Sequence, residues 1–273
     1  EGSHLSILSE IWGPPLITIR SHTGNRGACV IDATGFDHAL ETPGSEVLPE
    51  SQWFIDGLTI TGSRMAGLRA EGWTGDRLNS DQCDIHHCGA GVGAGARAGI
   101  RLSSTTVRDN QGYGLVSHSG GYMFIYSCEI SGNDGAGVWY WDTVRVQIVD
   151  TMIENNGGWG LEAYPHGEYS FDSGLIIERS SIQGNSSGGI SVQYPTHEYG
   201  LQFIESVLLN NSSEGGLDGE LLGVGHVQNY PIFLCCEMNL DQWIIDGHYG
   251  VVDDGCALSN ETMSFSELKA QYR

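Results

Sequence analysis

The sequence predicts an all-β parallel β-helix, a coiled ribbon in which each coil holds three short strands and three turns. An aliphatic anchor recurs at steps of 22 to 29 residues, at Ile60, Ile85, Val107, Ile130, Ile153, Ile182 and Leu208. Around the anchors apolar residues alternate, as in Val144, Val146 and Ile148, which is the period of a strand. The chain also has 40 glycines in 273 residues, placed at the ends of these short runs, where they interrupt helices. A regular step of about 23 residues is typical of a repeat protein.

Two further features recur in each coil. Three residues after the anchor stands a small or amide residue: Ser63, Cys88, Asn110, Asn133, Asn156, Asn185 and Asn211. A glycine followed by an aliphatic residue comes next, at Gly67-Leu68, Gly99-Ile100, Gly114-Leu115, Gly137-Val138, Gly160-Leu161, Gly189-Ile190 and Gly216-Leu217. Because stacked coils lie about 4.8 Å apart, we expect the aliphatic residues to line the interior. The asparagines should share amide hydrogen bonds from coil to coil.

The two ends of the chain depart from the repeat. Segments 17–20 and 29–32 are predicted as strands of the first coil. Residues 1–220 should form the coils, and 221–273 an irregular last coil and cap within the same domain. A short helix over 264–272, with Ser264 as N-cap and Glu267 completing a capping box, should cover the open core.

The unit Asn-x(3,4)-Gly-aliphatic, as in Asn110–Leu115 and Asn156–Leu161, resembles the repeat of a known superfamily. This is the right-handed parallel β-helix superfamily of pectate lyases, polygalacturonases and mannuronan epimerases. The resemblance covers residues 16 to 220 and implies a right-handed coil. The turn from Tyr164 to Glu168 is similar to the Asp-Pro-His-Asp/Glu motif of mannuronan epimerases at Pro165 and His166, but Tyr164 replaces the catalytic Asp. No complete motif set of these enzymes is present.

The net charge of the chain limits the classes of partner that it can bind. The formal net charge is −22, and residues 111–273 carry 4 basic and 21 acidic groups. Such a field repels nucleic acids and anionic membranes, and it disfavours a highly anionic polysaccharide unless the basic N-terminal coils form a subsite. No run of 18 apolar residues occurs, so we expect no membrane insertion. The chain opens at Glu1 without a signal peptide, and both ends look cropped. We expect a secreted or cell-surface protein with its signal upstream, and the pattern permits an oligomer.

Seven cysteines do not pair evenly. Cys83 and Cys128 hold the same position two coils apart, roughly 9.6 Å from the coil spacing, which is too far for a disulfide. We expect stacked, buried thiols there. Cys88 replaces an asparagine of the ladder, and one bridge is plausible among Cys235, Cys236 and Cys256.

The candidate site follows from which side chains point outward. If the aliphatic residue after each glycine points inward, the residues one and three positions later point out. The first outward row is Arg69, Arg101, Val116, Trp139, Glu162, Ser191 and Asp218. The second is Glu71, Ser103, His118, Trp141, Tyr164, Gln193 and Glu220. A line of exposed aromatic residues marks a binding surface, and flat rings beside carboxylates suit sugars.

The loops after Tyr164 and Tyr194 carry extra length at matching positions, which is where repeat proteins place binding. They bring His166, Glu168 and His197 toward the rim near His118. We therefore expect substrate to contact Trp139, Trp141, Tyr164, Arg101, Arg69, Gln193 and His197.

Three functions remain open. The favoured one is a secreted glycoside hydrolase that uses Glu162 with Asp218 or Glu168; the first two lie roughly 9.6 Å apart by coil spacing, near the upper limit for inverting enzymes. The second is a polysaccharide lyase or C5-epimerase, with His118, His166, Tyr164 and Arg101 supplying base, donor and cation. The third is a noncatalytic surface, filament or tailspike-like β-helix that binds glycans or serves as a scaffold. No metal site or cofactor is predicted firmly, although Asp76, Asp81 and Asp84 would permit calcium.

Overall fold

The structure is a computed structural model. It describes most of the repeat region and isolated strands near the C-terminus. The described residues are 16–42, 51–72, 76–118, 121–142, 145–164, 174–193, 200–209, 211, 221–224, 232–234, 237–238, 243–245 and 251–253. The helix expected over 264–272 and the cysteines at 235, 236 and 256 lie outside these residues.

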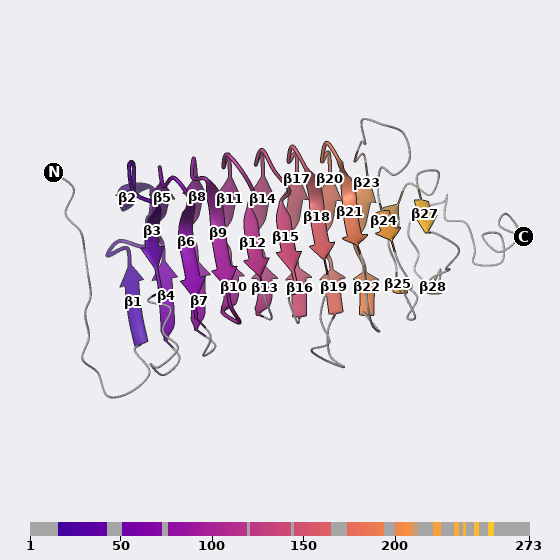
Figure 1. The fold of residues 1–273 in the computed structure, drawn as a ribbon, viewed down its shortest axis with the longest axis horizontal. Helices are drawn as coiled ribbons and strands as arrows, with labels where there is room; N and C mark the ends of the chain where they lie inside the picture. The colour runs from indigo at the N-terminus through magenta and orange to yellow at the C-terminus, as the bar shows by residue number, and fades with distance from the viewer. Residues whose placement is uncertain are drawn as a thin grey trace, which may run out of the picture.

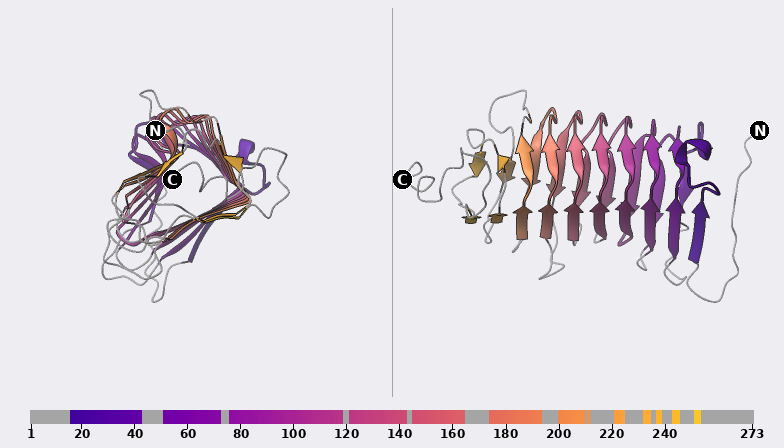
Figure 2. Two further views of the ribbon diagram at one scale, coloured as in Figure 1. Left: turned by 90° about the vertical axis from the view of Figure 1, so that its right-hand side faces the viewer. Right: turned by 180° about the vertical axis from the view of Figure 1, so that it is seen from behind.

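The described strands form a parallel β-helix (Figure 1). Each coil gives one strand to each of three sheets, so every neighbour in a sheet is three strands away in the chain. The three sheets enclose the interior on three sides (Figure 2). All the strand pairs are parallel, as the sequence predicts. Helical structure within the described residues is limited to the 3₁₀ turn η1 (Arg26–Ala28).

We name the sheets A, B and C in the order in which the chain enters them. Sheet A holds β1 (Leu16–Arg20), β4 (Gln52–Asp56), β7 (Arg77–Asp81), β10 (Gly99–Ser103), β13 (Tyr122–Tyr126), β16 (Arg145–Val149), β19 (Gly174–Glu178), β22 (Gly200–Ile204), β25 (Ile232–Leu234) and β28 (Val251–Asp253). Sheet B holds β2 (Val30–Asp32), β5 (Thr59–Thr61), β8 (Asp84–His86), β11 (Thr106–Arg108), β14 (Glu129–Ser131), β17 (Met152–Glu154), β20 (Ser181–Gln183), β23 (Val207–Leu209) and β26 (Glu237–Met238). Sheet C holds β3 (His38–Glu41), β6 (Ala66–Glu71), β9 (Ala90–Gly95), β12 (Leu115–His118), β15 (Val138–Trp141), β18 (Trp159–Tyr164), β21 (Gly188–Gln193), β24 (Leu221–Val224) and β27 (Trp243–Ile245).

The seven predicted anchors stack as one column through sheet B. Ile60 pairs with Ile85, Ile85 with Val107, and the register continues coil by coil to Leu208. All seven side chains are buried. Each aliphatic side chain packs on its equivalents in the coils above and below, so the core is a set of ladders rather than a single centre.

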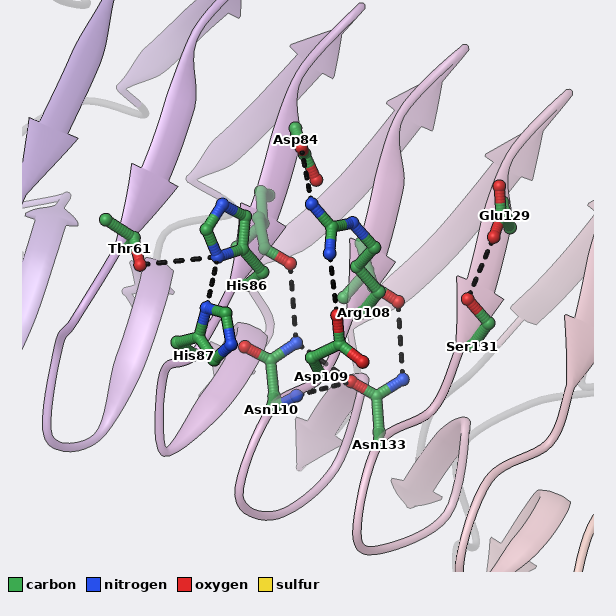
Figure 3. Close-up of polar contacts among 12 residues, drawn as sticks. Thr61, Asp84, His86, His87, Arg108, Asp109, Asn110, Glu129, Ser131 and Asn133 are labelled. Carbon is green, nitrogen blue, oxygen red and sulfur yellow. Dashed lines mark hydrogen bonds and ion pairs between the residues drawn. The ribbon is translucent and has the colours of Figure 1, made fainter. Parts of the chain in front are cut away.

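A buried amide ladder stands beside the anchors, as predicted (Figure 3). Asn110 donates its side-chain N–H to Oδ1 of Asn133 at 2.8 Å, and the same bond links Asn133 to Asn156 at 2.9 Å. The series continues through Asn185 to Asn211. Each amide also receives a backbone N–H from the preceding coil and donates to a backbone carbonyl, as Asn133 does to Val107. The ladder therefore satisfies polar groups that are shielded from water.

A parallel row of hydroxyls and thiols supports the turns between sheets A and B. The backbone N–H of Cys83 bonds to Thr105, that of Cys128 to Thr151, and the row goes on through Ser180. Both cysteines are buried and free, as predicted, and Thr105 of the intervening coil lies between them in the row. Burial raises the pKa of Cys128 to about 11, so the thiol stays protonated.

The structure corrects the predicted repeat in two coils. Gly99-Ile100 begins β10 of sheet A, whereas Val92 stands beside Leu68 and Leu115 in sheet C. Ile190 pairs with Leu221 instead of Leu217. Coil pairing also runs past residue 220, because β24 to β28 each join a strand of the preceding coil. Both Gly91-Val92 and Gly99-Ile100 follow Cys88 before the next anchor at Val107, and the local pattern alone does not choose between them.

Candidate functional site

The outer face of sheet C carries most of the predicted site residues. Strand pairing aligns Arg69, Gly93, Val116, Trp139, Glu162 and Ser191 in one row. A second row contains His118, Trp141 and Tyr164 on consecutive coils. The predicted neighbours Trp139, Trp141, Glu162, Tyr164 and His118 therefore do come together on one surface.

Two predicted members do not hold the row positions expected of them. Arg101 lies on β10 of sheet A, in register with Asn79 and Phe124, so its assignment to the sheet C row is wrong. The position next to Ser191 is Leu222, so Asp218 is not the row partner of Glu162 that the spacing predicts. Asp218, Glu168, His166 and His197 themselves lie outside the described residues, as does the side chain of Gln193.

Trp139 is the centre of an aromatic cluster. Its indole lies 5.6 Å from the ring of Tyr113, 4.9 Å from that of His118 and 5.8 Å from that of Tyr164, measured between centroids. Trp141, the next outward residue of β15, is 50% exposed. Sequence reasoning missed Tyr113. The available signal was its place just before the Gly114-Leu115 pair, which matches Trp159 before Gly160 two coils later.

Glu162 and Tyr164 form a polar pair beside this cluster. They are two residues apart on β18 and so point to the same face. The phenol of Tyr164 donates to Oε1 of Glu162 at 2.6 Å. Burial raises the pKa of Tyr113 on the other side of Trp139, and the negative charge of Glu162 adds to that effect.

His118 reaches Trp139 from β12, whereas Tyr164 reaches it from β18, and these two strands flank β15 on opposite sides. His118 is exposed at the surface, and partial desolvation by its neighbours lowers its pKa below the ordinary value of 6.5; Glu71 opposes the shift and Arg69 reinforces it. Removing water from around an imidazole disfavours its charged form. The lowered pKa favours the neutral form of the His118 imidazole.

Arg69 is held by acidic neighbours. Its Nη2 lies 2.6 Å from Glu71, its Nε lies 3.4 Å from Glu41, and its Nη1 lies 3.3 Å from His38. The guanidinium of Arg69 is thus already paired with two carboxylates. A ligand carboxylate would have to displace them in order to bind Arg69.

A separate polar network lies on the outer face of sheet B (Figure 3). Arg108 pairs with Asp84 at 3.1 Å and with Asp109 at 2.6 Å, and the Nδ1 atoms of His86 and His87 lie 2.6 Å apart. Asp84 is thus paired with Arg108.

Asp76, another of the aspartates that would permit calcium, accepts the backbone N–H of Ser51 at 2.6 Å. In the part of the chain that the structure describes, no three or more His, Cys, Asp or Glu side chains converge to hold a metal ion.

Comparison with known proteins agrees with the architecture. A family model described as a right-handed β-helix region matches residues 46–205, more than half of the chain. A crystal structure of a double mutant of the periplasmic alginate epimerase AlgG is similar to this chain, with a TM-score of 0.50 and 15% sequence identity. The similarity covers 87% of this chain and 66% of that one, just under two thirds of its length. At this identity it shows a shared fold. No curated protein matches the chain, and no described helix is long and apolar enough to span a membrane.

Proposed function

The chain belongs to the right-handed β-helix family, and from that premise we propose that it is a polysaccharide-active enzyme whose site is the outer face of sheet C. The observation that carries the proposal is the arrangement around Trp139, where an imidazole from β12 and a carboxylate-bound phenol from β18 both lie beside the indole.

The aromatic surface fits a sugar chain. Trp139 and Trp141 are successive outward residues of β15, and Trp141 is half exposed. Sugar rings have apolar faces that stack on such side chains, while their hydroxyl rims bond to groups such as Glu162. A saccharide here would lie across β12, β15 and β18, within reach of His118 and Tyr164.

The chemistry that we propose is proton transfer at the carbon next to a uronate carboxylate, as in a lyase or a C5-epimerase. A neutral His118 can accept the proton, and Tyr164 can donate or return one while Glu162 orients its phenol. This reverses the preference for a hydrolase drawn from the sequence. On the described sheet C strands the groups around Trp139 are an imidazole, a phenol and one carboxylate, a set that fits proton transfer more closely than the carboxylate pair of a hydrolase.

The similar structure named above is that of a periplasmic alginate epimerase. Together with the arrangement around Trp139, it supports a uronate-containing polymer as the substrate and an exported location for this chain.

The test is incubation with a panel of neutral and uronate polysaccharides in deuterated buffer. Three products are measured together: unsaturated ends by absorbance, deuterium at C5 by NMR, and new reducing ends. We expect unsaturated ends or C5 deuterium, with activity reduced at least about 100-fold in His118→Gln and Tyr164→Phe. Because partial desolvation lowers the pKa of His118, activity should persist below pH 6.5, the ordinary value for imidazole.

Matched controls separate chemistry from folding. His22→Gln removes an exposed imidazole on a turn at the other end of the described coils and should leave activity unchanged. Reducing ends without unsaturation or deuterium would replace the proposal with a hydrolase. Binding of a polysaccharide without any product would replace it with a noncatalytic glycan-binding protein.

A further inference from the structure

The outer face of sheet A has three outward columns between β4 and β19. The third carries Asp56, Asp81 and Glu178, whereas the first two differ in charge from the molecule as a whole. Over the six strands from β4 to β19, its first two outward columns contain no carboxylate, in a chain with 34 acidic residues. We call these twelve positions the sheet A platform. The first column is Gln52, Arg77, Gly99, Tyr122, Arg145 and Gly174, and the second is Phe54, Asn79, Arg101, Phe124, Gln147 and Ile176. The four strands β7, β10, β13 and β16 lie side by side at its centre (Figure 1).

Aromatic rings form a continuous strip along β13. All three of its outward residues are aromatic, with centroid distances of 5.1 Å from Tyr122 to Phe124 and 6.4 Å from Phe124 to Tyr126. Phe54, three coils away in the same column as Phe124, is 38% exposed. Rings that project from a flat sheet offer stacking surfaces to a ligand that lies along it.

Guanidinium groups flank this strip. Arg101 lies over the ring of Tyr126 at 5.3 Å and Arg77 over that of Tyr122 at 6.0 Å. Arg101 and Arg145 are exposed, and within the described residues neither forms an ion pair. An arginine stacked on a ring keeps its planar fork of donors available for a carboxylate.

We propose that the sheet A platform binds an acidic glycan, an extended sugar chain that carries carboxylates. Stacking on Tyr122 and Phe124 would hold the sugar rings, while Arg101 and Arg145 would pair with the carboxylates. A local positive surface on a chain of net charge −22 is complementary to a partner of moderate negative charge. A nucleic acid is the alternative polyanion, and its binding is one of the outcomes of the test below.

This platform is separate from the site on sheet C and does not depend on the chemistry proposed there. The two faces meet at one corner of the coil, since Trp141 ends β15 and Arg145 begins β16 four residues later. A long polymer could therefore be held on sheet A while one of its segments is processed on sheet C.

The test is calorimetric binding of hexagalacturonate, with cellohexaose as the neutral comparison. Arg101→Gln and Arg145→Gln should each weaken the binding of hexagalacturonate at least about tenfold, because each removes a charge-assisted contact. Phe124→Ala should weaken it through lost stacking. Arg64→Gln is the matched control: it removes one positive charge from an exposed arginine that pairs with Asp37, away from the platform, and should change little.

A second readout locates the ligand. Phenylglyoxal modifies exposed arginines, and hexagalacturonate should protect Arg101 and Arg145 but not Arg64, as mapped by mass spectrometry. Glu162→Gln should leave this protection intact even where it abolishes turnover, so failure on sheet C and failure on sheet A are distinguishable. Unchanged circular dichroism and unfolding midpoints check that each variant is folded.

Several results would overturn the proposal. These are no binding of hexagalacturonate, equal weakening by Arg64→Gln, or equally tight binding of cellohexaose. Tighter binding of a single-stranded oligonucleotide that depends on Arg101 would assign the platform to nucleic acid. Self-association that Arg101→Gln abolishes would assign it to a second copy of the chain.

Discussion

Each buried asparagine of the ladder joins neighbouring coils through several hydrogen bonds. Asn156 accepts both the backbone N–H and the side-chain N–H of Asn133, at 3.1 and 2.9 Å, and donates to Asn185 and to the carbonyl of Ile130. Its side chain is fully buried. A buried donor that loses its acceptor costs about 1–3 kcal/mol. Removing one amide therefore also destabilises the protein through the partners that it leaves without a hydrogen bond.

Asn156→Ala is expected to lower the free energy of unfolding by about 3 kcal/mol or more, because both donors of Asn133 lose their acceptor. Denaturant titration measures this change. The adjacent Asn155 provides the control. It is exposed with φ of 55°, a left-handed conformation that glycine adopts freely. Asn155→Gly should stay within about 0.5 kcal/mol of the wild type. If both variants lost the same free energy of unfolding, the buried ladder would contribute no more to stability than an exposed asparagine does.

Sheet C strands depend on glycine where two coils approach most closely. A Cβ on Gly137 would lie 2.6 Å from Cγ2 of Ile153 and 2.8 Å from the carbonyl oxygen of Gly160, both in the next coil. At Gly93, on the outer face of the same sheet, the nearest atom would be Cγ1 of Val116 at 3.6 Å, an ordinary contact. The glycine before the inward aliphatic residue is therefore a packing requirement between coils at positions 67, 91, 114, 137 and 160.

Gly137→Ala is expected to cost about 1–3 kcal/mol of unfolding free energy, the usual result of overpacking. Gly93→Ala should be neutral or stabilising, because alanine restricts the unfolded chain and meets no obstacle here. Thermal or denaturant unfolding of the pair checks both. A destabilised Gly93→Ala beside an unaffected Gly137→Ala would contradict this account of the close approach.

The whole molecule is a stack of coils in which each coil contacts mainly its neighbours. Stability in such a stack is close to a sum of coil terms and interface terms. Thr106 pairs with Asp84 and Val107 with Ile85, so one coil can replace the next without a change of register.

Deletion of residues 84–105, one complete coil, should therefore leave a folded protein with cooperative unfolding and a modestly lower midpoint. Deletion of residues 84–94 removes half a coil and places polar residues at interior positions, so it should not fold. Circular dichroism and size-exclusion chromatography compare the two. An unfolded full-coil deletion beside a folded half-coil deletion would show that the coils are not interchangeable units.

Sequence alone was sufficient wherever one chemical type recurs at one spacing. The anchors from Ile60 to Leu208, the amide row from Asn110 to Asn211 and the stacked positions of Cys83 and Cys128 all follow from that recurrence. Each coil must bury the same side chain at the same place to satisfy the coil before it. The grouping of His118, Trp139, Trp141, Glu162 and Tyr164 follows equally from strand alternation beside these ladders.

Where the length of a coil varies, only the tertiary structure determines to which sheet each strand belongs. Both Gly91-Val92 and Gly99-Ile100 satisfy the local pattern, but only parallel pairing with the whole neighbouring coil places Val92 in sheet C. That choice moves Arg101 to sheet A beside Phe124, and it turns a presumed site cation into part of a different surface. In the same way, Leu222 rather than Asp218 follows Ser191. Local spacing records which residues can face outward, whereas the pairing of complete coils selects the sheet to which they belong.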